Sequence, residues 1–418
     1  MHVLINAASA NMGGAVTYLK NVLRWMPEVA PLDRITVIIP KATHEKLELL
    51  PTFIDRIRIQ YYPYANTGGL NRFYFDQIEI PRLVSRMGAD VLFSSTGFAT
   101  WKSPVPQVLL VRNPVYFSAE FEDVYRRIGR SLLRNRMRRF LSIVSIKRSD
   151  VVLFPTRAMQ AMVEQHVSLD GRRSEAIHYG FDHEAFFRSG PEQYEGLGQV
   201  AAWKSEGYKI MLNVSTYAVH KNFETLVEGI SNALKRGVRC KLLTTTSREK
   251  TADKREYDAM RARIADLGLE NTIVELGYVP YEALSAVYAM ADAFVFPSLT
   301  ESFGHSMVES MAAGLPVIAA DTAVNREICG DAAVYFRTHD GVDCGKAIYD
   351  LLTDDTLLQE KIERSKVRAS HFSWKEYSMS LSTIFNDAVR SRQDSADTDP
   401  ESELEIGEPI HDVSAAVR

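Results

Sequence analysis

The most informative segment of the chain is Pro297-Ser298-Leu299-Thr300-Glu301-Ser302-Phe303-Gly304-His305-Ser306-Met307-Val308-Glu309. It follows the apolar run 293–296, which predicts a buried strand, and its glycine-containing turn leads into a segment with helical character. The first N–H groups of a helix have no partner within the helix. A strand, a short turn and a helix N-terminus in this order therefore favour the binding of an anionic group.

Two carboxylates, Glu301 and Glu309, stand eight positions apart in this stretch. If the residues between them were helical, the two would be separated by roughly 12 Å along the helix axis. That is the scale of a nucleotide sugar, with one carboxylate near each of its two sugars and the phosphates between them. On the carboxylates alone, a surface helix with two unrelated glutamates is the better interpretation, so the surrounding sequence has to decide.

The surrounding sequence carries a family resemblance. Residues 297–317, which end in Glu309-Ser310-Met311-Ala312-Ala313-Gly314-Leu315-Pro316-Val317, closely resemble the Glu-x7-Glu signature of the retaining glycosyltransferases of family four. The resemblance implies an α/β protein with two Rossmann-like domains that face each other across a cleft, the GT-B architecture, and a C-terminal helix that crosses back to the first domain. It also implies that Glu301 binds hydroxyls of the donor hexose, that Glu309 holds the ribose, and that the amides of Phe303 and Gly304 lie near the donor.

Length and composition bound the class of protein. The 418 residues are too many for one ordinary core and suit two domains. The net charge of −4 argues against a general nucleic-acid binder, and the three cysteines show no CxxC or metal spacing, which fits a reducing compartment. No apolar run is long enough to cross a bilayer, and Met1–Ile5 leads into a strand without a charged leader. We therefore expect a cytoplasmic protein, with peripheral contact at the inner face of the cytoplasmic membrane left open.

Short apolar runs alternate with longer helical patterns, which predicts parallel sheets covered on both faces. The runs are 3–7, 35–39, 91–94, 108–111 and 151–154 in the first half, and 210–214, 241–244, 272–276, 293–296, 316–319 and 333–335 in the second. Segment 189–207 separates the two sets and is interpreted as a linker. We predict a first domain over 1–188 and a second over 207–370, to which the resemblance assigns the acceptor side and the nucleotide sugar.

The C-terminal region continues the resemblance. Phe372-Ser373-Trp374 resembles the family segment that starts the crossing helix, so we predict that helix over 371–392. Residues 393–418 are polar and acidic, which predicts a disordered tail. Within it, Asp397-Thr398-Asp399 looks like the Asp-x-Asp of metal-dependent glycosyltransferases, but no strand precedes it. Because no metal ligands are clustered in the sequence and the fold brings none, we expect neither a metal nor a cofactor.

A Gly-Gly pair, Gly13 and Gly14, follows the first strand in Asn11-Met12-Gly13-Gly14-Ala15. Glycine allows the backbone to approach a ligand, and the following helix N-terminus favours negative charge. Taken alone, the pair is better explained as a tight strand–helix turn. Its position matches the family's Gly-Gly loop near the donor phosphates and the acceptor, so the resemblance implies a donor-binding role for both glycines.

Segment 213–226 follows the first strand of the second half and contains Ser215, His220 and Lys221. It resembles the family segment in which a lysine neutralises the leaving diphosphate, a task that suits a compact cation. By that resemblance Lys221 is catalytic, and Ser215 stands where the family often has glycine. Many members carry an arginine shortly before the lysine. It is missing here, and Ser215 or His220 could partly substitute for it in donor binding. The alternative for Lys221 is a solvated lysine at a helix start.

Arg112, in Leu109-Leu110-Val111-Arg112-Asn113-Pro114, departs from the family pattern. Many relatives have a histidine near the reacting sugar at this position, whereas arginine cannot act as a base near neutral pH. We expect Arg112 to lie in the catalytic site, where it would bind a phosphate or an acidic acceptor group. A structural role in its loop is the alternative.

Residues 125–148 carry nine basic side chains and no acidic one, with apolar residues interleaved at helical spacing. The basic residues are Arg126, Arg127, Arg130, Arg134, Arg136, Arg138, Arg139, Lys147 and Arg148. A basic amphipathic helix in an acidic protein favours contact with an anionic membrane surface. The alternative, equally supported, is a long helix whose apolar stripe packs on the first domain while its arginines are solvated.

These features imply a retaining hexosyltransferase that moves a hexose from a nucleotide diphosphate sugar to a carbohydrate or lipid-linked acceptor in glycan or polysaccharide biosynthesis. In such enzymes the leaving phosphate oxygen is thought to take the acceptor proton, so that no separate base is needed. Two alternatives remain, a sugar-nucleotide epimerase of the same fold and a non-catalytic partner subunit of a glycosyltransferase. The substituted histidine and the missing arginine favour the partner subunit, whereas the joint presence of Lys221, Glu301 and Glu309 argues against it.

Overall fold

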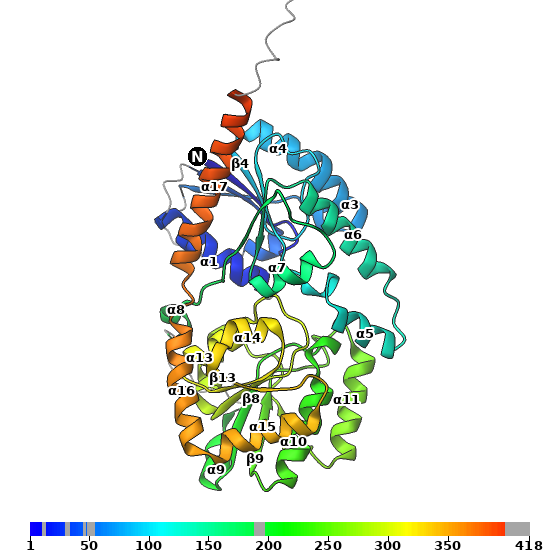
Figure 1. The fold of residues 1–418 in the computed structure, drawn as a ribbon, viewed down its shortest axis with the longest axis vertical. Helices are drawn as coiled ribbons and strands as arrows, with labels where there is room; N and C mark the ends of the chain where they lie inside the picture. The colour runs from blue at the N-terminus through cyan, green and yellow to red at the C-terminus, as the bar shows by residue number, and fades with distance from the viewer. Residues whose placement is uncertain (11–13, 30–33, 45–46, 48–54, 188–196, 398–418) are drawn as a thin grey trace, which may run out of the picture.

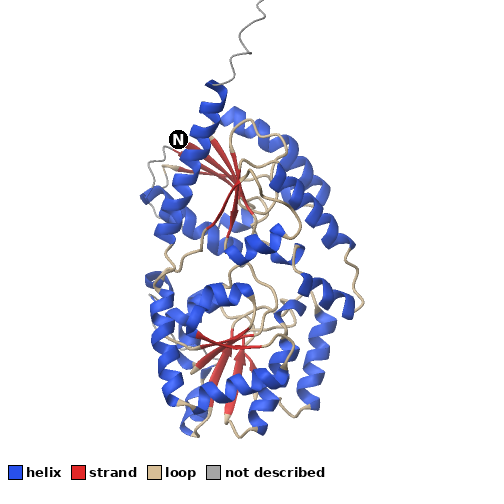
Figure 2. Cartoon of the chain, in the orientation of Figure 1, coloured by secondary structure: helices blue, strands red, loops and turns tan. Residues whose placement is uncertain are grey.

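The computed structural model describes residues 1–10, 14–29, 34–44, 47, 55–187 and 197–397. Within these ranges the chain forms two parallel sheets, one in each half, with helices on both faces (Figures 1 and 2). The first sheet has seven strands in the order β3-β2-β1-β4-β5-β6-β7, and the second has six in the order β10-β9-β8-β11-β12-β13. The α/β architecture with two Rossmann-like halves is therefore confirmed.

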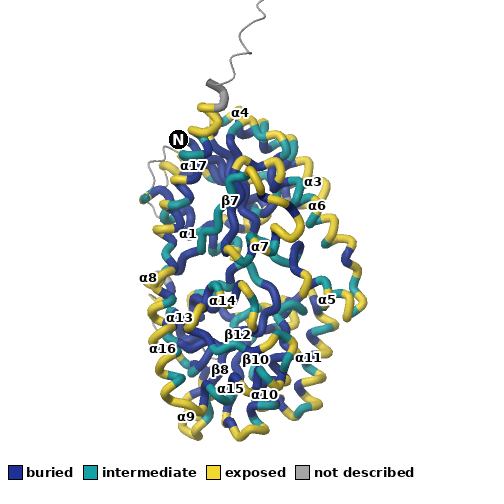
Figure 3. The backbone as a smooth tube through the Cα atoms, in the orientation of Figure 1, coloured by how far each residue is buried: buried dark blue, intermediate teal, exposed yellow. Residues whose placement is uncertain are grey.

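The strands are short and mostly buried, as Figure 3 shows for the centre of each half. Those of the first sheet are β1 (His2–Asn6), β2 (Arg34–Ile38), β3 (Ile57–Gln60), β4 (Val91–Ser94), β5 (Gln107–Leu110), β6 (Val151–Phe154) and β7 (Arg173–Ala176). Those of the second are β8 (Lys209–Asn213), β9 (Cys240–Thr244), β10 (Ile273–Glu275), β11 (Ala293–Phe296), β12 (Val317–Ala320) and β13 (Ala333–Phe336). Every run predicted from the sequence is present, while β3 and β7, the two edges of the first sheet, were not predicted.

Helices follow most strands, as parallel crossovers require. In the first half they are α1 (Gly14–Val29), α2 (Lys41–His44), α3 (Gly69–Tyr74), α4 (Ile80–Met87), α5 (Ala119–Arg127), α6 (Leu133–Lys147), α7 (Arg157–Glu164) and α8 (His183–Phe187). In the second they are α9 (Val200–Ser205), α10 (Phe223–Lys235), α11 (Lys254–Asp266), α12 (Tyr281–Met290), α13 (His305–Ala312), α14 (Ala323–Cys329), α15 (Gly341–Thr353) and α16 (Asp355–Ala369). Helix α9 lies within the segment interpreted as a linker, and its Val200 is buried. The domain boundaries themselves remain predictions.

The last helix, α17 (Trp374–Asp397), returns to the first half after α16 has ended in the second (Figure 1). It packs against α1, β4 and β5. Tyr377 of α17 and Tyr18 of α1 share a hydrogen bond with 2.7 Å between their hydroxyl oxygens. The predicted crossing helix is thus confirmed, although it extends beyond its predicted end at 392. Most of the predicted disordered tail, 398–418, lies outside the described residues.

The basic segment 125–148 is not one continuous helix. Helix α5 ends at Arg127 and α6 begins at Leu133, and Gly129 between them has a φ of 69° that favours glycine. The prediction of a single amphipathic helix is therefore wrong, because the turn at Gly129 redirects the chain. Among the described ranges, none of the helices combines the length and apolar character needed to cross a membrane.

Candidate functional site

The turn between β11 and α13 ends in an uncapped helix N-terminus. Gly304 is the N-cap of α13 with φ 87° and ψ 62°, and as a glycine it has no side chain to cap the first turn. The positive φ of Gly304 favours glycine, and a Cβ there would lie 2.4 Å from Cε of Met307, which would have to move. Met307 donates its N–H to the carbonyl of Gly304 at 3.0 Å, so within the described ranges the N–H groups of His305 and Ser306 are the ones available to an anionic ligand. Because the helix begins at His305, the predicted separation of roughly 12 Å, which assumed a helix from Glu301 onward, does not apply.

Lys221 and Glu301 form an ion pair beside this turn. Lys221 ends the short 3₁₀ helix η6 (Val219–Lys221), and its Nζ lies 2.5 Å from Oε1 of Glu301. Both side chains are largely buried, with 21% and 15% of their surface exposed. Burial alone would raise the pKa of Glu301, but the Lys221 ammonium and the neighbouring His220 hold that pKa below its ordinary value. The lowered pKa favours the ionised form of Glu301, which holds the Lys221 ammonium next to the turn that opens α13.

The loop that carries Lys221 is attached to the turn after β11 by its backbone. The N–H of Leu299 donates to the carbonyl of His220 at 2.9 Å, and Nδ2 of Asn222 donates to the carbonyl of Pro297 at 3.2 Å. Burial and the charge of Lys221 lower the pKa of His220 to about 4, so its ring is neutral. Two segments that are far apart in the sequence therefore form one unit.

Ser215 lies just beyond the end of β8. Its hydroxyl donates to Oδ1 of Asn213 at 3.3 Å, and its N–H donates to Oγ1 of Thr245 at 3.1 Å. Neither Ser215 nor the neutral His220 carries the positive charge that the missing arginine would supply. The hypothesis that Ser215 or His220 partly substitutes for the missing arginine therefore does not extend to the positive charge of that arginine.

Glu309 lies on α13 and is 8% exposed. Its Oε2 accepts a hydrogen bond from the hydroxyl of Tyr288 on α12 at 2.9 Å. Burial raises the pKa of Glu309 to about 7, and the Tyr288 hydrogen bond offsets only part of that rise. A carboxylate held in this way can accept further hydrogen bonds from ligand hydroxyls.

The raised pKa of Glu309 predicts a pH-dependent stability. The pKa of Glu309 is higher in the folded state than in the unfolded state, so the folded protein favours the protonated carboxyl. The free energy of unfolding should therefore fall as pH rises from about 4.5 through about 7, because the buried carboxyl then loses its proton. Without ligand, Glu309→Gln, which keeps an acceptor for Tyr288, should be more stable than the wild type at pH 8 by about 3 kcal/mol. The difference should disappear near pH 4.5. Urea unfolding at both pH values measures it, and a pH-independent difference would contradict it.

Phe303 has a buried side chain that belongs to an aromatic cluster. Its ring lies 5.2 Å from that of Tyr179 and 5.6 Å from that of Phe372, measured between centroids, and the residue is 1% exposed. The cluster joins the end of the first half, the turn before α13 and the start of α17. Only the backbone of Phe303 is therefore suited to donor contact, as the resemblance implies.

Gly14 and Arg112 from the first half meet His305 from the second. A Cβ on Gly14, the first residue of α1, would lie 3.6 Å from Cδ2 of His305 and 3.7 Å from Nη2 of Arg112. The guanidinium of Arg112, which follows β5, also lies 5.5 Å from the ring centroid of Tyr18. Within the described ranges Arg112 has no carboxylate partner. Gly13 lies outside the described residues, so its predicted role stays a prediction.

His305 is a site residue that the sequence did not single out. Its ring stacks on Tyr179 with 5.4 Å between centroids. Burial and the charge of Arg112 lower the pKa of His305 to about 4, while the charge of Glu301 acts in the opposite direction. A neutral imidazole is therefore held between a cation of the first half and a carboxylate of the second. Its place directly after the helix-opening glycine is the signal that could have identified it.

Hydrogen bonds across the two halves surround these residues. Oγ1 of Thr156 donates to the carbonyl of Ser302 at 3.1 Å. The carboxylate of Glu327 on α14 accepts from the N–H groups of Arg157 and Ala158 at 2.8 and 2.7 Å, at the N-terminus of α7. A carboxylate is favourable at a helix N-terminus. The first contact holds the turn before α13 against the first half, and the other two hold α14 against α7.

Arg130 makes a second connection between the halves. Its guanidinium pairs with Asp253 at 2.5 Å and with Glu256 at 2.6 Å, and Asp253 also accepts from the N–H of Val219 at 3.1 Å. Val219 begins η6, which ends in Lys221. Arg130 was among the residues predicted to face lipid, and this is wrong because acidic partners from the second half bind it.

The assembled residues suit the binding of a charged sugar derivative. Lys221, Arg112 and the free N–H groups of α13 can stabilise negative charge that develops on a diphosphate. Glu301 and Glu309 can accept hydrogen bonds from sugar hydroxyls, and neutral His305 can donate one. In the described part of the chain no three or more His, Cys, Asp or Glu side chains are grouped as metal ligands.

Comparison with protein families gives a match in each half. The family described as glycosyl transferases group 1 matches residues 200–368, which include the turn before α13 and the Lys221 loop. The family described as glycosyltransferase family 4 matches residues 12–185, which include Gly14 and Arg112.

Similar proteins align over shorter segments. The D-inositol 3-phosphate glycosyltransferase of Corynebacterium kroppenstedtii is 37% identical over 128 residues, which is 30% of this chain and 28% of that protein. The O-antigen chain mannosyltransferase B of Escherichia coli is 36% identical over 106 residues, 25% of this chain and 28% of that protein. The aligned segments thus span less than a third of either relative.

Solved structures match over nearly the whole chain. Sucrose-phosphate synthase from Thermosynechococcus elongatus has a TM-score of 0.70 at 14% identity, over 94% of this chain and 100% of that one. The Anabaena protein HepE in complex with UDP-glucose has a TM-score of 0.65 at 16% identity, with the same coverage. At these identities the likeness is one of fold, and the fold is GT-B. With a family match in each half as well, the chain belongs to the group 1 glycosyltransferases of family four.

Proposed function

We propose that this protein is a retaining hexosyltransferase that takes its hexose from a nucleotide diphosphate sugar and gives it to a carbohydrate or lipid-linked acceptor in glycan biosynthesis. The observation that carries the proposal is the junction of the two halves. There the Lys221–Glu301 pair and the uncapped N-terminus of α13 lie on one side, and Arg112 lies on the other. The names of the relatives, a mannosyltransferase among them, and the UDP-glucose bound to HepE support a hexose donor.

In the proposed reaction the bond between the anomeric carbon and the donor phosphate oxygen breaks, and a bond from that carbon to an acceptor oxygen forms on the same face. Lys221 and the N–H groups of α13 stabilise the charge that develops on the diphosphate. Glu301 and Glu309 orient the hexose and the ribose. The leaving phosphate oxygen takes the acceptor proton, and Arg112 binds a phosphate of the donor or an acidic group of the acceptor.

The proposal is tested by incubating the full-length protein with the glucose, galactose and mannose conjugates of UDP, GDP, ADP and TDP, together with glycan and lipid-linked acceptors. Thermal-shift measurements select the donor, because a ligand that binds only the folded state raises its melting temperature. NMR of the product gives the anomeric configuration, which should match that of the donor. An epimerase would change the sugar nucleotide without an acceptor, and a partner subunit would give no turnover. A product of inverted configuration would contradict retention.

The proposed reaction should not depend on a divalent cation, because Lys221, Arg112 and α13 supply the positive charge at the diphosphate. Adding EDTA to the transferase assay should leave the initial rate unchanged, and adding Mg²⁺ or Mn²⁺ afterwards should not raise it. A rate that is lost with EDTA and restored by one metal would contradict this prediction.

We also propose peripheral contact with an anionic membrane through α6. Leu133, Met137 and Phe140 are 77%, 56% and 63% exposed, and at 3.6 residues per turn they form one stripe. Exposed basic residues, among them Arg136 and Lys147, border that stripe. An apolar stripe bordered by cations is the pattern of a helix that lies on an anionic surface. These three apolar side chains do not pack on the first domain as the alternative required.

Vesicle sedimentation at low salt tests this contact. The wild type should sediment with phosphatidylglycerol vesicles and not with phosphatidylcholine, and high salt should weaken binding. The triple substitution of Leu133, Met137 and Phe140 by serine should abolish it. Val367→Ser is the matched control, because Val367 is 63% exposed on α16 in the other half. Equal vesicle binding by the triple variant would contradict the proposal.

A further inference from the structure

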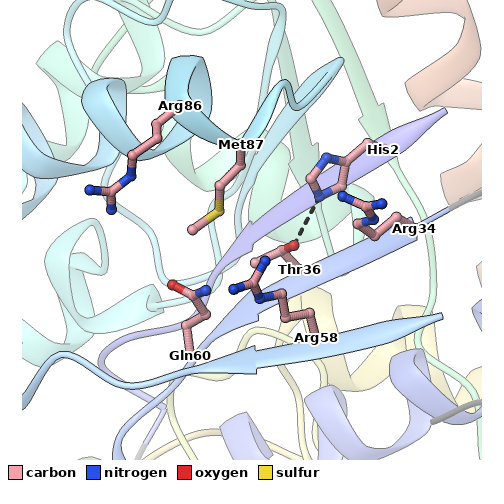
Figure 4. Close-up of a pocket in the computed structure, with 7 residues that line it drawn as sticks. All are labelled: His2, Arg34, Thr36, Arg58, Gln60, Arg86 and Met87. Carbon is pink, nitrogen blue, oxygen red and sulfur yellow. Dashed lines mark hydrogen bonds between the residues drawn. The ribbon is translucent and has the colours of Figure 1, made fainter. Parts of the chain in front are cut away.

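A basic cavity of about 380 Å³ lies on one face of the first sheet, beside its edge strand β3 (Figure 4). It is lined by His2, Arg34, Thr36, Arg58, Gln60, Arg86 and Met87. Arg112 follows β5, which is three strands away from β2 in the sheet order. The cavity is therefore separate from the site at the junction of the two halves.

The register of the sheet explains why the polar side chains converge. In the parallel pairing His2 lies opposite Arg34, and Thr36 lies opposite Arg58. Because side chains alternate along a strand, Arg34 and Thr36 share one face, and so do Arg58 and Gln60. Figure 4 shows the guanidinium of Arg58 beside Thr36 and that of Arg34 beside His2.

Within the described ranges, the arginines of this cavity have no anionic partners. In the described ranges no carboxylate pairs with Arg34, Arg58 or Arg86, whereas Arg72 and Arg82 on neighbouring segments pair with Asp76 and Glu79. A cation in the last turn of α4, where Arg86 lies, is favourable without a ligand. Arg34 and Arg58 are exposed and line the same cavity from adjacent strands, an arrangement in which two like charges favour a bound anion.

The remaining polar groups are oriented by their contacts. Nδ1 of His2 lies 3.3 Å from the carbonyl of Gly88, which can only accept, so Nδ1 carries the proton. Nε2 then accepts from the Thr36 hydroxyl at 2.9 Å. The carboxylate of Asp90 accepts from the backbone N–H of His2 at 2.6 Å and is thereby engaged outside the lining. Burial, with a smaller contribution from the charge of Arg34, lowers the pKa of His2.

We propose that this cavity binds the phosphate group of a small phosphate monoester. Arg34 and Arg58 are the phosphate ligands, because two guanidinium groups provide the planar donors that phosphate oxygens prefer. Gln60 offers an amide, and Met87 an apolar surface, to the organic part of the ester. The volume lies within the range of small-molecule sites. A free metabolite and a phospholipid headgroup share this chemistry. The proposal does not rest on the proposed transferase activity.

The test uses the ring of His2 as a local reporter in the full-length protein. Histidine-selective NMR, with the His2 signal assigned from His2→Gln, is recorded during titration with glycerol 3-phosphate at constant ionic strength. A saturable shift and a rise in the pKa of His2 are expected, because a bound anion favours the imidazolium. Arg34→Gln and Arg58→Gln should each weaken binding by about tenfold or more. Arg236→Gln, which removes an exposed cation at the end of α10, should not change it.

Two further measurements separate the sources of the phosphate. Phosphatidic acid vesicles that shift the His2 signal while glycerol 3-phosphate does not would assign the cavity to a lipid headgroup, and the reverse result would assign it to a free ester. Absence of a saturable shift in both titrations would overturn the proposal. So would equal weakening by Arg236→Gln, since binding would then follow net charge rather than the cavity.

Discussion

Replacing Lys221 by alanine should lower kcat for sugar transfer by about 10²–10³-fold, with a smaller change in KM for the donor. The ammonium is fixed 2.5 Å from Glu301 next to the free N–H groups of α13. A preorganised charge at the place where negative charge develops acts on the transition state more than on the bound donor. Steady-state kinetics with the donor selected by thermal shift measure both constants.

The variant also changes Glu301, and a second substitution separates the two effects. Without the Lys221 ammonium, Glu301 keeps only weaker support for its charge, so its pKa should rise. If the pair acts as a unit, the double variant Lys221→Ala/Glu301→Gln should be little worse than Lys221→Ala alone. Lys235→Ala is the matched control, because Lys235 is an exposed residue in the last turn of α10. A kcat for Lys221→Ala equal to that of Lys235→Ala would refute the assigned role.

Replacing Gly180 by alanine should destabilise the protein by about 3 kcal/mol or more. A Cβ at this position would lie 1.9 Å from the backbone nitrogen of Trp374 and 2.4 Å from the carbonyl carbon of Ser373. The next residue, Phe181, donates its N–H to the carbonyl of Phe372 at 3.1 Å. Two backbones therefore touch here, and unlike a flexible side chain they cannot turn away.

The result would appear as a lower urea midpoint and as faster limited proteolysis of α17, because the clash lies where that helix returns to the first half. Gly69→Ala is the control, since a Cβ there would meet nothing within 4 Å and Gly69 begins helix α3. It should leave stability unchanged or slightly raised. Similar midpoints for both variants would show that the close approach at Gly180 contributes nothing to stability.

The two strands that the sequence did not predict share a physical property. Both β3 and β7 are edges of the first sheet, so they need not be apolar on both faces. β7 reads Arg-Ser-Glu-Ala and is partly exposed throughout, while β3 alternates apolar and polar residues. The central strands form near-continuous apolar runs because helices cover both of their faces, and that pattern is visible without a structure.

The sequence also pointed to Lys221, Glu301, Gly304 and Glu309. Lys221 lies between a recognisable strand, β8, and the helix α10, and the other three lie in the turn after β11 or in the helix α13 that follows it. It could not show that Arg130 is neutralised by Asp253 and Glu256. The partners of that arginine lie more than a hundred positions away in the other half of the chain. The uncharged states of His220 and His305 were equally inaccessible, because burial depends on residues from both halves.

By itself, then, the sequence determined the local features of this protein: the central strands of both sheets, the glycine that opens α13, and the residue types near it. Periodicity and turn chemistry act over a few residues, so they can be seen along the chain. Only the tertiary structure decided which of those features meet. The Lys221–Glu301 pair and the cavity beside β3 depend on the strand order within each half, and the approach of Arg112 to His305 depends on the packing of one half against the other. Strand order and packing are set by how the apolar residues of the whole chain are buried together.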